Sequence, residues 1–286
     1  MNKFPDFAKK YPTAAGAVTG AAAVLTYFSL DDSRPKATFY KMASKRVRAP
    51  FRIGLISDLH SYELGKGQWK LLHMTRTLKP DILAFCGDIF DDLRMCDDAV
   101  MELLDPLGKE FRGFYVTGNH ECWSGRIDPI LRKIRSCGIT VLNGEGMDIE
   151  INGTPVSIWG IDDPAIDMCR GNGTFALELN RYSTEAGRFS VLLSHRPEYA
   201  DIFSSLPCDL VLAGHAHGGQ WRSPLFPNGL FASGQGFFPE YTGGEYPLGE
   251  GRMLIVSTGL RPGTRPLPRI NNRPEIVFVD VVPCSA

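Results

Sequence analysis

The chain alternates between short apolar runs and longer stretches with helical spacing. Eight runs rich in Val, Ile, Leu and Phe have the length of buried β-strands: residues 51–56, 81–86, 111–116, 156–161, 189–193, 209–213, 253–257 and 275–282. Residues 68–78 and 128–137 carry apolar side chains three and four positions apart, which predicts helices with one face against a sheet. Together these runs predict an α/β layered fold with buried sheets.

The composition is that of an ordinary globular domain. The 286 residues are 43% hydrophobic, enough for one substantial core. Because 31 basic residues balance 32 acidic ones, no binding of duplex nucleic acid is expected, and any affinity for phosphate must come from a local site. The seven cysteines are irregularly spaced, and Cys86 lies inside an apolar run as a small core residue. This usage favours a reducing compartment.

The first part of the chain differs from the rest. Residues 11–30 carry no charge, and a helix of 20 residues extends about 30 Å, the thickness of a bilayer core. Small residues come first and bulky ones last, the reverse of the order in a cleaved signal peptide. We therefore expect residues 1–35 to be a hydrophobic membrane-anchoring segment, with a signal peptide or a surface helix as alternatives. Residues 36–50 are expected to be a basic linker and residues 51–286 the catalytic domain.

Basic residues flank the uncharged run on both sides. Three precede it, and six follow it: Arg34, Lys36, Lys41, Lys45, Arg46 and Arg48. Because basic residues are enriched on the cytoplasmic side, the heavier cluster favours a membrane-associated protein with a cytoplasmic catalytic domain. The same cluster could lie on anionic lipid headgroups, or be a solvated linker.

Polar clusters follow five of the predicted strands. They are Asp58-Leu59-His60, Gly87-Asp88-Ile89-Phe90-Asp91, Gly118-Asn119-His120-Glu121, Ser194-His195 and Gly214-His215-Ala216-His217. Ligands bind at strand ends in open α/β sheets, so these clusters can converge, and they contain five of the six histidines. Carboxylate, imidazole and amide groups without thiolate suit hard-to-borderline divalent metals and exclude a zinc finger.

These five clusters, in this order, resemble the signature of the calcineurin-like metallophosphoesterase superfamily over residues 52 to the C-terminus. The stretch Gly214-His215-Ala216-His217-Gly218-Gly219-Gln220, with Ser257-Thr258-Gly259-Leu260 further on, is similar to the YkuE/YaeI-type bacterial branch. Members of this branch often carry an N-terminal hydrophobic segment. The resemblance implies a four-layer αββα sandwich of two mixed β-sheets flanked by helices.

The resemblance also implies a binuclear metal centre. It assigns Asp58, His60 and His217 to one metal ion, assigns Asn119, His195 and His215 to the other, and makes Asp88 the bridge. The implied cofactors are two divalent ions, with Mn, Fe, Zn and Co all acceptable to such ligands. Water activated between the two cations then hydrolyses a phosphate ester.

Two further residues receive catalytic roles from the resemblance. His120 matches the histidine that faces the scissile phosphate without binding metal, and a structural histidine is the alternative. Asp91 matches the carboxylate that orients it, and its neighbour Asp92 is the alternative. Glu121 is expected to be a solvated or hydrogen-bonded neighbour.

Features outside the metal centre indicate the substrate less specifically. Arg196 and Arg222 could hold substrate phosphate through their planar forks, or form salt bridges. The Gly-rich stretch 218–251 is expected to be a long loop or flap, and it contains Trp221, Phe226, Phe231, Phe237, Phe238, Tyr241 and Tyr246. These aromatic residues suit a lipid or sugar-nucleotide entrance, or a small core of the loop itself.

The sequence therefore predicts a metal-dependent phosphohydrolase. We expect a phosphodiesterase or pyrophosphatase-like enzyme acting on a lipid- or nucleotide-linked phosphate. A broad phosphomonoesterase and a non-catalytic scaffold with the same fold are the alternatives.

Overall fold

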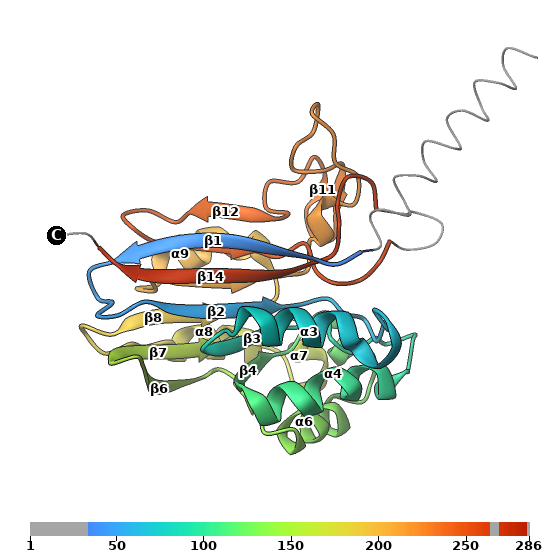
Figure 1. Ribbon diagram of the computed structural model, residues 1–286, viewed down its shortest axis with the longest axis horizontal. Coiled ribbons are helices and arrows are strands. Elements are labelled where there is room, and N and C mark those ends of the chain that lie inside the picture. The colour runs from blue at the N-terminus through green and yellow to red at the C-terminus, as the bar shows by residue number, and fades with distance from the viewer. Residues whose placement is uncertain (1–33, 264–268, 285–286) are drawn as a thin grey trace, which may run out of the picture.

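A computed structural model describes residues 34–263 and 269–284, which form two mixed six-stranded sheets packed face to face (Figure 1). The first sheet has the order β1-β14-β2-β3-β4-β5. Its strands are β1 (Lys36–Ser44), β2 (Phe51–Ile56), β3 (Ile82–Cys86), β4 (Arg112–Val116), β5 (Thr140–Val141) and β14 (Glu275–Pro283). The second sheet has the order β12-β13-β9-β8-β7-β6. Its strands are β6 (Glu145–Ile151), β7 (Thr154–Gly160), β8 (Phe189–Leu193), β9 (Leu210–Ala213), β12 (Gly244–Pro247) and β13 (Met253–Val256).

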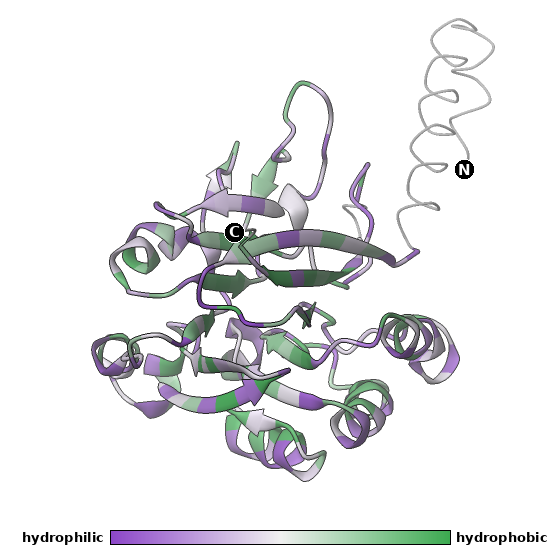
Figure 2. Ribbon diagram, turned by 60° about the vertical axis from the view of Figure 1, so that its left-hand side comes forward, coloured by the Kyte–Doolittle hydropathy of each residue, from purple (hydrophilic) through white to green (hydrophobic). Residues whose placement is uncertain are grey.

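The main core lies between the two sheets. Alternate residues of each strand face inward, so Ile53 and Leu55 of β2 meet Val191 and Leu193 of β8 in one fully buried cluster. In Figure 2 hydrophobic colour is concentrated on the strands, whereas the outer helices carry both hydrophilic and hydrophobic residues. This distribution is that of sheets buried on both faces and helices buried on one.

Helices cover the outer faces of both sheets. They are α3 (Trp69–Leu78), α4 (Asp97–Glu110), α5 (Asn119–Trp123), α6 (Ile127–Ser136), α7 (Ile166–Arg170), α8 (Thr174–Arg181) and α9 (Ala200–Ser205), with 3-10 turns η1 (Lys66–Gln68), η2 (Pro197–Tyr199) and η3 (His217–Gly219). Residues of α3, α4 and α6 pack on the outer face of the first sheet, and α9 packs on the second. The predicted αββα sandwich is confirmed. The eight predicted strands and two predicted helices are present, with ends within two residues of the prediction.

The prediction of a linker over residues 36–50 is wrong for its first nine residues. Lys36–Ser44 forms β1, which pairs in parallel with β14 along its whole length. Phe39 stacks on Phe278, and Met42 enters the core between the sheets. Because β1 is an edge strand, its lysines remain in contact with solvent, and their charges concealed the strand in the sequence.

The predicted anchor lies outside the described residues except for Arg34 and Pro35. Within residues 34–263 and 269–284, no helix is long and apolar enough to cross a membrane. All seven cysteines are free, and Cys86 is buried as expected.

The predicted loop over residues 218–251 is largely irregular. It contains the two-residue strands β10 (Phe231–Ala232) and β11 (Gly236–Phe237), which form a small hairpin, and the short strand β12 at its end. Figure 1 shows this segment projecting beyond the sheets near β11.

Candidate metal centre

The candidate ligands follow five parallel strands of the two sheets. Asp58 and His60 follow β2, Asp88 follows β3 and Asn119 follows β4; His195 follows β8, and His215 and His217 follow β9. Strands β2, β3 and β4 are parallel, as are β8 and β9, so their carboxyl ends meet at one edge of the sandwich. All seven side chains are buried. The predicted convergence of the clusters is therefore observed.

The loops that carry these residues are tightly bonded to one another. The Asp58 amide donates to the Gly87 carbonyl (3.0 Å), and the Gly214 amide donates to the His195 carbonyl (3.0 Å). The Leu260 amide donates to the Ser57 carbonyl (3.0 Å), which joins the last loop of the second sheet to the first ligand loop. Backbone bonds thus hold the ligand positions of both sheets in one rigid unit.

Most of the candidate ligands have an unusual backbone conformation. Five of the seven lie in the left-handed region: Asp58 (φ 53°), His60 (φ 49°), Asp88 (φ 53°), His215 (φ 67°) and His217 (φ 47°). Such conformations are uncommon for residues with a Cβ and cost about 1–3 kcal/mol each. Their concentration at one edge marks a site where the fold maintains strain for the placement of side chains.

Two glycines allow the loops to approach the ligands. A Cβ at Gly118 would clash with the carboxylate and the backbone nitrogen of Asp88. A Cβ at Gly214 would lie 2.5 Å from Asp58 Oδ2. Glycine before Asn119 and before His215 is therefore needed because neighbouring loops touch there.

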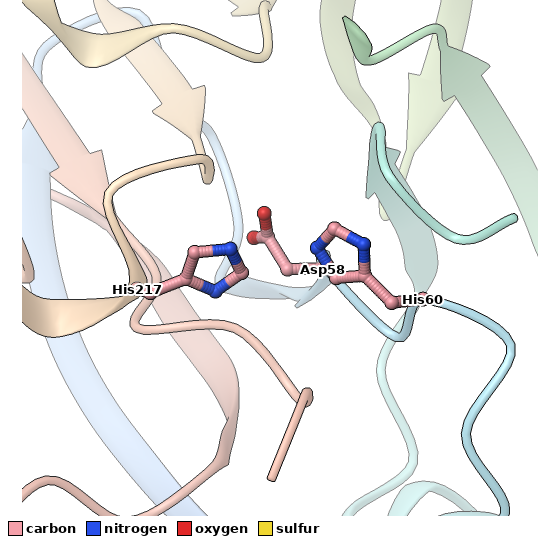
Figure 3. A group of neighbouring side chains, drawn as sticks. All are labelled: Asp58, His60 and His217. Atoms are coloured by element: carbon pink, nitrogen blue, oxygen red, sulfur yellow. The ribbon is translucent and has the colours of Figure 1, made fainter. Parts of the chain in front are cut away.

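The side chains form two groups with the spacing of metal ligands. Asp58, His60 and His217 place ligand atoms within 4.8 Å of one another and point toward a common centre (Figure 3). Asp88, His195 and His215 form the second such group. Asp88 Oδ2 lies 3.2 Å from His195 Nε2 and 3.7 Å from His60 Nε2, so this carboxylate stands between the two groups. That is the position a bridging ligand requires.

Unsatisfied polar atoms support binding of cations here. His60 Nε2, Asn119 Oδ1 and His217 Nδ1 are buried and have no hydrogen-bond partner among the described residues. Burying such atoms without a partner is costly, and a bound cation removes that cost. Imidazole, carboxylate and amide groups are the donors that Mn, Fe, Zn and Co share. The residues thus fit two divalent metal ions.

The protein environment sets the charges of these ligands before any ion binds. Burial lowers the pKa of His60, His215 and His217, so their imidazoles are neutral. Burial by itself would raise the pKa of Asp88, but the neighbouring His195 holds it well below its usual range. Burial also opposes a charge on His195, yet Asp88 raises the pKa of that imidazole to about 10.

His120 lies at the rim of the centre. Its side chain is 19% exposed, and its Nε2 is 3.9 Å from Asp88 Oδ2. Its Nδ1 lies 2.6 Å from Asp92 Oδ1 and 3.8 Å from the nearer oxygen of Asp91. The choice of Asp91 over Asp92 as the carboxylate that orients His120 is therefore corrected, because Asp92 makes the hydrogen bond.

Asp91 instead serves His60. Its Oδ2 lies 3.1 Å from His60 Nδ1, and its Oδ1 accepts the backbone amides of Leu93 and Arg94. Burial would raise the pKa of Asp91, but the hydrogen bonds from His60 and these amides hold it well below its usual range. The structure contains a third group of possible ligand atoms, on His60, Asp91 and His120. The hydrogen bond between His60 and Asp91 explains why these atoms lie close together. Asp91 thereby fixes the ring that presents Nε2 to the metal centre.

Glu121 is fully buried, so the expectation of a solvated residue is wrong and that of a hydrogen-bonded one is confirmed. Its carboxylate accepts the amides of Asp88 (2.9 Å), Phe90 (2.9 Å) and Gly118 (2.8 Å), and the hydroxyl of Tyr115 (2.7 Å). Glu121 therefore joins the loops after β3 and β4. In the sequence, this role was indicated by the position of Glu121 two residues after the candidate ligand Asn119.

The two arginines expected near substrate make contacts within the protein. Arg196 donates from Nε and Nη2 to the buried carboxylate of Asp163 (2.6 and 3.3 Å). Of the two expectations for Arg196, the ion pair is the one that the structure contains. Arg222 donates from Nη2 to Thr242 Oγ1 (3.3 Å) and the Gly243 carbonyl (3.0 Å). A phosphate contact of Arg222 stays a prediction.

Comparison with known proteins agrees with this geometry. Residues 51–219, more than half of the chain, match the model of the calcineurin-like phosphoesterase family. An uncharacterized metallophosphoesterase of Aquifex aeolicus is 35% identical, over 71% of this chain and 73% of its own length. Phosphodiesterase YaeI of Escherichia coli is 28% identical, over 82% and 83%. The uncharacterized metallophosphoesterase YkuE of Bacillus subtilis is 31% identical, over 69% and 66%.

Some relatives are considerably longer. The chain spans 36% of the Caenorhabditis elegans protein F40B5.2 and 61% of Cj0846 of Campylobacter jejuni. It spans 52% of a Danio rerio protein named "Transmembrane protein with metallophosphoesterase domain", with 28% identity.

The family match, the two sheets and the two ligand groups define the class: the chain belongs to the calcineurin-like phosphoesterase family, and its ligand groups suit a binuclear metal centre. Its cofactors are two divalent metal ions. Within this family, the similarity to YaeI and YkuE places it in the YkuE/YaeI-type bacterial branch.

Proposed function

We propose that this enzyme is a phosphodiesterase or pyrophosphatase-like hydrolase whose substrate carries an apolar group beside the scissile phosphate. The observation that carries the proposal is a group of exposed apolar side chains on the loop after η3. Phe231 and Phe237 contact each other and are 42% and 70% exposed, and the adjacent Phe238 is 71% exposed. Soluble proteins rarely leave such a group uncovered without a binding role.

This loop is joined to the metal centre. The proposed ligand His217 directly precedes it in the 3-10 turn η3, and the Leu230 amide donates to the Gly219 carbonyl (2.9 Å). A groove of about 380 Å³ lies within this loop, lined by Gln220, Trp221, Leu230, Phe231 and Phe237. We propose that one substrate molecule places its phosphate at the metal ions and its apolar group in this groove. A lipid tail or the base of a nucleotide would suit this lining.

The loop separates into two parts. Tyr241 and Tyr246 contact each other edge to face and pack against the buried cluster outside the second sheet. Phe231 and Phe237 also contact each other, yet both remain exposed. The expectation of a small core within the loop therefore suits its last part, and that of an apolar entrance suits its tip.

The proposed chemistry uses the residues as placed. Two divalent ions held by the seven ligands would activate water and offset the charge on the phosphoryl oxygens. Asp88 would lie between the ions, and Asp92 would hold His120 Nδ1 so that Nε2 faces the substrate. His120 would then donate the proton from Nε2 to the leaving oxygen, a contribution of about 10²–10⁴-fold. The name of YaeI, a phosphodiesterase, supports a diester substrate.

Membrane association is the second part of the proposal. A groove of about 710 Å³ is lined by Arg34, Pro35, Trp69, Lys70, His73, Met74, Thr77, Leu78 and Arg273. This lining contains three permanent cations and an exposed tryptophan but no carboxylate among the described residues. Arg34 lies four positions after the uncharged run of residues 11–30. A groove of this composition suits anionic lipid headgroups beside an anchor, with the catalytic domain in the cytoplasm.

The substrate class is tested with purified protein and each of Mn, Fe, Zn and Co in turn. The substrates are matched panels of phosphomonoesters, phosphodiesters and nucleotide-linked lipids. Preferential diester or pyrophosphate turnover supports the proposal, and preferential monoester turnover supports a broad phosphomonoesterase. Tight binding of two ions without turnover of any substrate would identify a scaffold.

The membrane part is tested by deleting residues 1–35, which leaves β1 intact. The variant should move from the membrane fraction to the soluble fraction while it keeps hydrolysis of a small soluble ester. Full-length protein that is soluble without detergent would refute the anchor. Loss of every activity in a variant that still binds both ions would assign the segment to the site instead.

A further inference from the structure

Among the described residues, the outward-facing ring nitrogen of His215 has no hydrogen-bond partner, whereas the corresponding nitrogen of His195 has one. His195 places Nδ1 2.7 Å from the Cys86 carbonyl, so its Nε2 faces Asp88 in the centre, at 3.2 Å. His215 Nδ1 lies 3.1 Å from that Nε2, on the inner side of the group with Asp88. The opposite atom, His215 Nε2, is buried and unpartnered. It therefore lacks the outer contact that normally fixes the tautomer of a ligating imidazole.

The carboxylate of Glu198, whose side chain is largely buried, faces this nitrogen. Glu198 Oε1 lies 3.8 Å from His215 Nε2, and Glu198 Oε2 has no hydrogen-bond partner in the part of the chain that the structure describes. The 3.8 Å separation exceeds a hydrogen bond by about 1 Å, a distance that a small rotation of the carboxylate closes. One bond would satisfy the ring nitrogen and an oxygen of this carboxylate.

Glu198 is held in place from behind. Its Oε1 is 3.5 Å from Nη1 of Arg196, whose other nitrogens bind the buried carboxylate of Asp163. Asp163 in turn accepts the Ala165 amide (2.8 Å). A buried ion pair of this kind restricts the rotation of Arg196, and Arg196 restricts the position of Glu198.

The hairpin of β10 and β11 covers the same pair. Gly234 lies in its turn with φ 75°, and a Cβ there would clash with Glu198 Oε1 and lie 3.5 Å from His215 Nε2. Only a glycine leaves room for the carboxylate to face the imidazole. The loop that presents the apolar side chains thus also covers the outer side of this ligand.

We propose that Glu198 is a positioning residue that accepts a hydrogen bond from His215 Nε2–H and so reserves His215 Nδ1 for the metal ion. Asp163 and Arg196 hold Glu198 in this position. The bond fixes the tautomer and orientation of the ring and raises the basicity of the ligating nitrogen. Asp91 stands in the same relation to His60, at 3.1 Å. The inference rests on the ligand assignment of the proposed function, but not on its substrate.

The test measures metal affinity rather than turnover. Wild type, Glu198→Ala and Glu198→Gln are loaded with Zn²⁺ or Mn²⁺ and titrated with a chelator, and the ions remaining per chain are counted. Outer partners of ligating histidines contribute about 10–100-fold to metal affinity. Glu198→Ala should therefore lose one of the two ions at about 10–100-fold lower chelator concentration, and the other at the wild-type concentration. Glu198→Gln keeps an acceptor oxygen and should fall between them.

Two further variants complete the design. Gly234→Ala should lower the affinity for the same ion, because the added Cβ displaces Glu198. Glu185→Ala removes an exposed glutamate that pairs with Arg188, and it should match wild type. Melting of the metal-free proteins confirms that each variant is folded.

The results separate this inference from the proposed function. Wild-type affinity for both ions in Glu198→Ala, or equal weakening of both, overturns the positioning role. Activity that stays lost in Glu198→Ala at saturating metal would indicate contact with substrate and would also overturn it. If wild type binds two ions but hydrolyses no phosphoester, the proposed function fails while the affinity ratio still tests Glu198.

Discussion

The metal centre and the loop over residues 218–251 are adjacent, but they are built differently. The seven candidate ligands are buried, and backbone hydrogen bonds connect the turns that carry them. The loop has two-residue strands and exposes Leu225, Phe237 and Phe238. Substitutions in the metal centre disturb many neighbouring atoms, whereas substitutions at the exposed tip of the loop disturb few.

This difference teaches how the two tasks are divided. Chemistry at phosphorus needs donors fixed at the ends of strands, where two sheets hold them rigid. Recognition of the remainder of a substrate needs surface that varies without disturbing those donors. The loop begins directly after the proposed ligand His217 and carries the apolar tip in its middle, so one segment connects both tasks.

Removing the bridge should have the largest effect. We expect Asp88→Ala to lose both metal ions and all detectable hydrolysis, because one carboxylate stands between both ligand groups. Elemental analysis of the purified variant measures this, with Asp98→Ala on α4 as the matched control. Retention of two ions per chain would disprove the bridging role and break the division between the two regions.

His120→Ala should keep both ions and lose about 10²–10⁴-fold in kcat, with less change in KM. The loss should be greatest for esters with poor leaving groups, because a nitrophenolate needs little help from a proton. Equal losses on both ester types would favour stabilisation of the phosphoryl group, and loss of metal would make His120 a ligand.

Variants of the adjacent residues Asp91 and Asp92 should show different defects. Asp92→Asn should share the leaving-group dependence of His120→Ala in weaker form, because Asp92 Oδ1 is the hydrogen-bond partner of His120. Asp91→Asn should mainly weaken metal binding through His60. The reverse pattern would restore the role that the sequence favoured for Asp91.

Polar substitution at the loop tip should have a smaller and more selective effect. The double variant Phe237→Ser and Phe238→Ser should raise KM several-fold for an amphiphilic diester while kcat/KM for a small soluble diester stays unchanged. Leu177→Ser on α8, also an exposed apolar position, is the control. An equal loss on both substrates would mean that the tip supports the metal centre rather than the apolar group.

The smallest expected effect is a change in melting temperature caused by substitution of Glu178 on α8, outside the metal centre. Burial, followed by the nearby Asp162, raises the pKa of Glu178 to about 7. A carboxyl whose pKa is raised in the folded state is most favourable when protonated, so stability is lost as pH rises from about 4.5 through 7. Glu178→Gln should therefore melt about 2–4 °C above wild type at pH 8, with the difference vanishing near pH 4. Melting curves at both pH values test this, and a gap independent of pH would contradict it.

The pattern of residues determined a layered α/β fold and the convergence of the polar clusters, whereas the four-layer sandwich was implied by the family resemblance. Apolar runs of strand length predict buried sheets, and polar residues directly after parallel strands must meet at one edge. The assignment of Asp58, Asp88 and Asn119 as ligands was implied by the family resemblance, and their position after strands and their chemistry agree with it. These features are local in the chain, so periodicity and motif order are sufficient to find them.

Only the tertiary structure decided which side chains are partners in the site. Asp91 and Asp92 are adjacent, yet the turn after β3 directs one toward His60 and the other toward His120. The strand β1 is recognisable only beside β14, more than 230 residues away in the sequence. Glu198 faces His215 because strands β8 and β9 are neighbours and a glycine in a distant hairpin leaves room. Each of these relations depends on side-chain direction and on contacts between remote segments, which the spacing of residues along a chain does not encode.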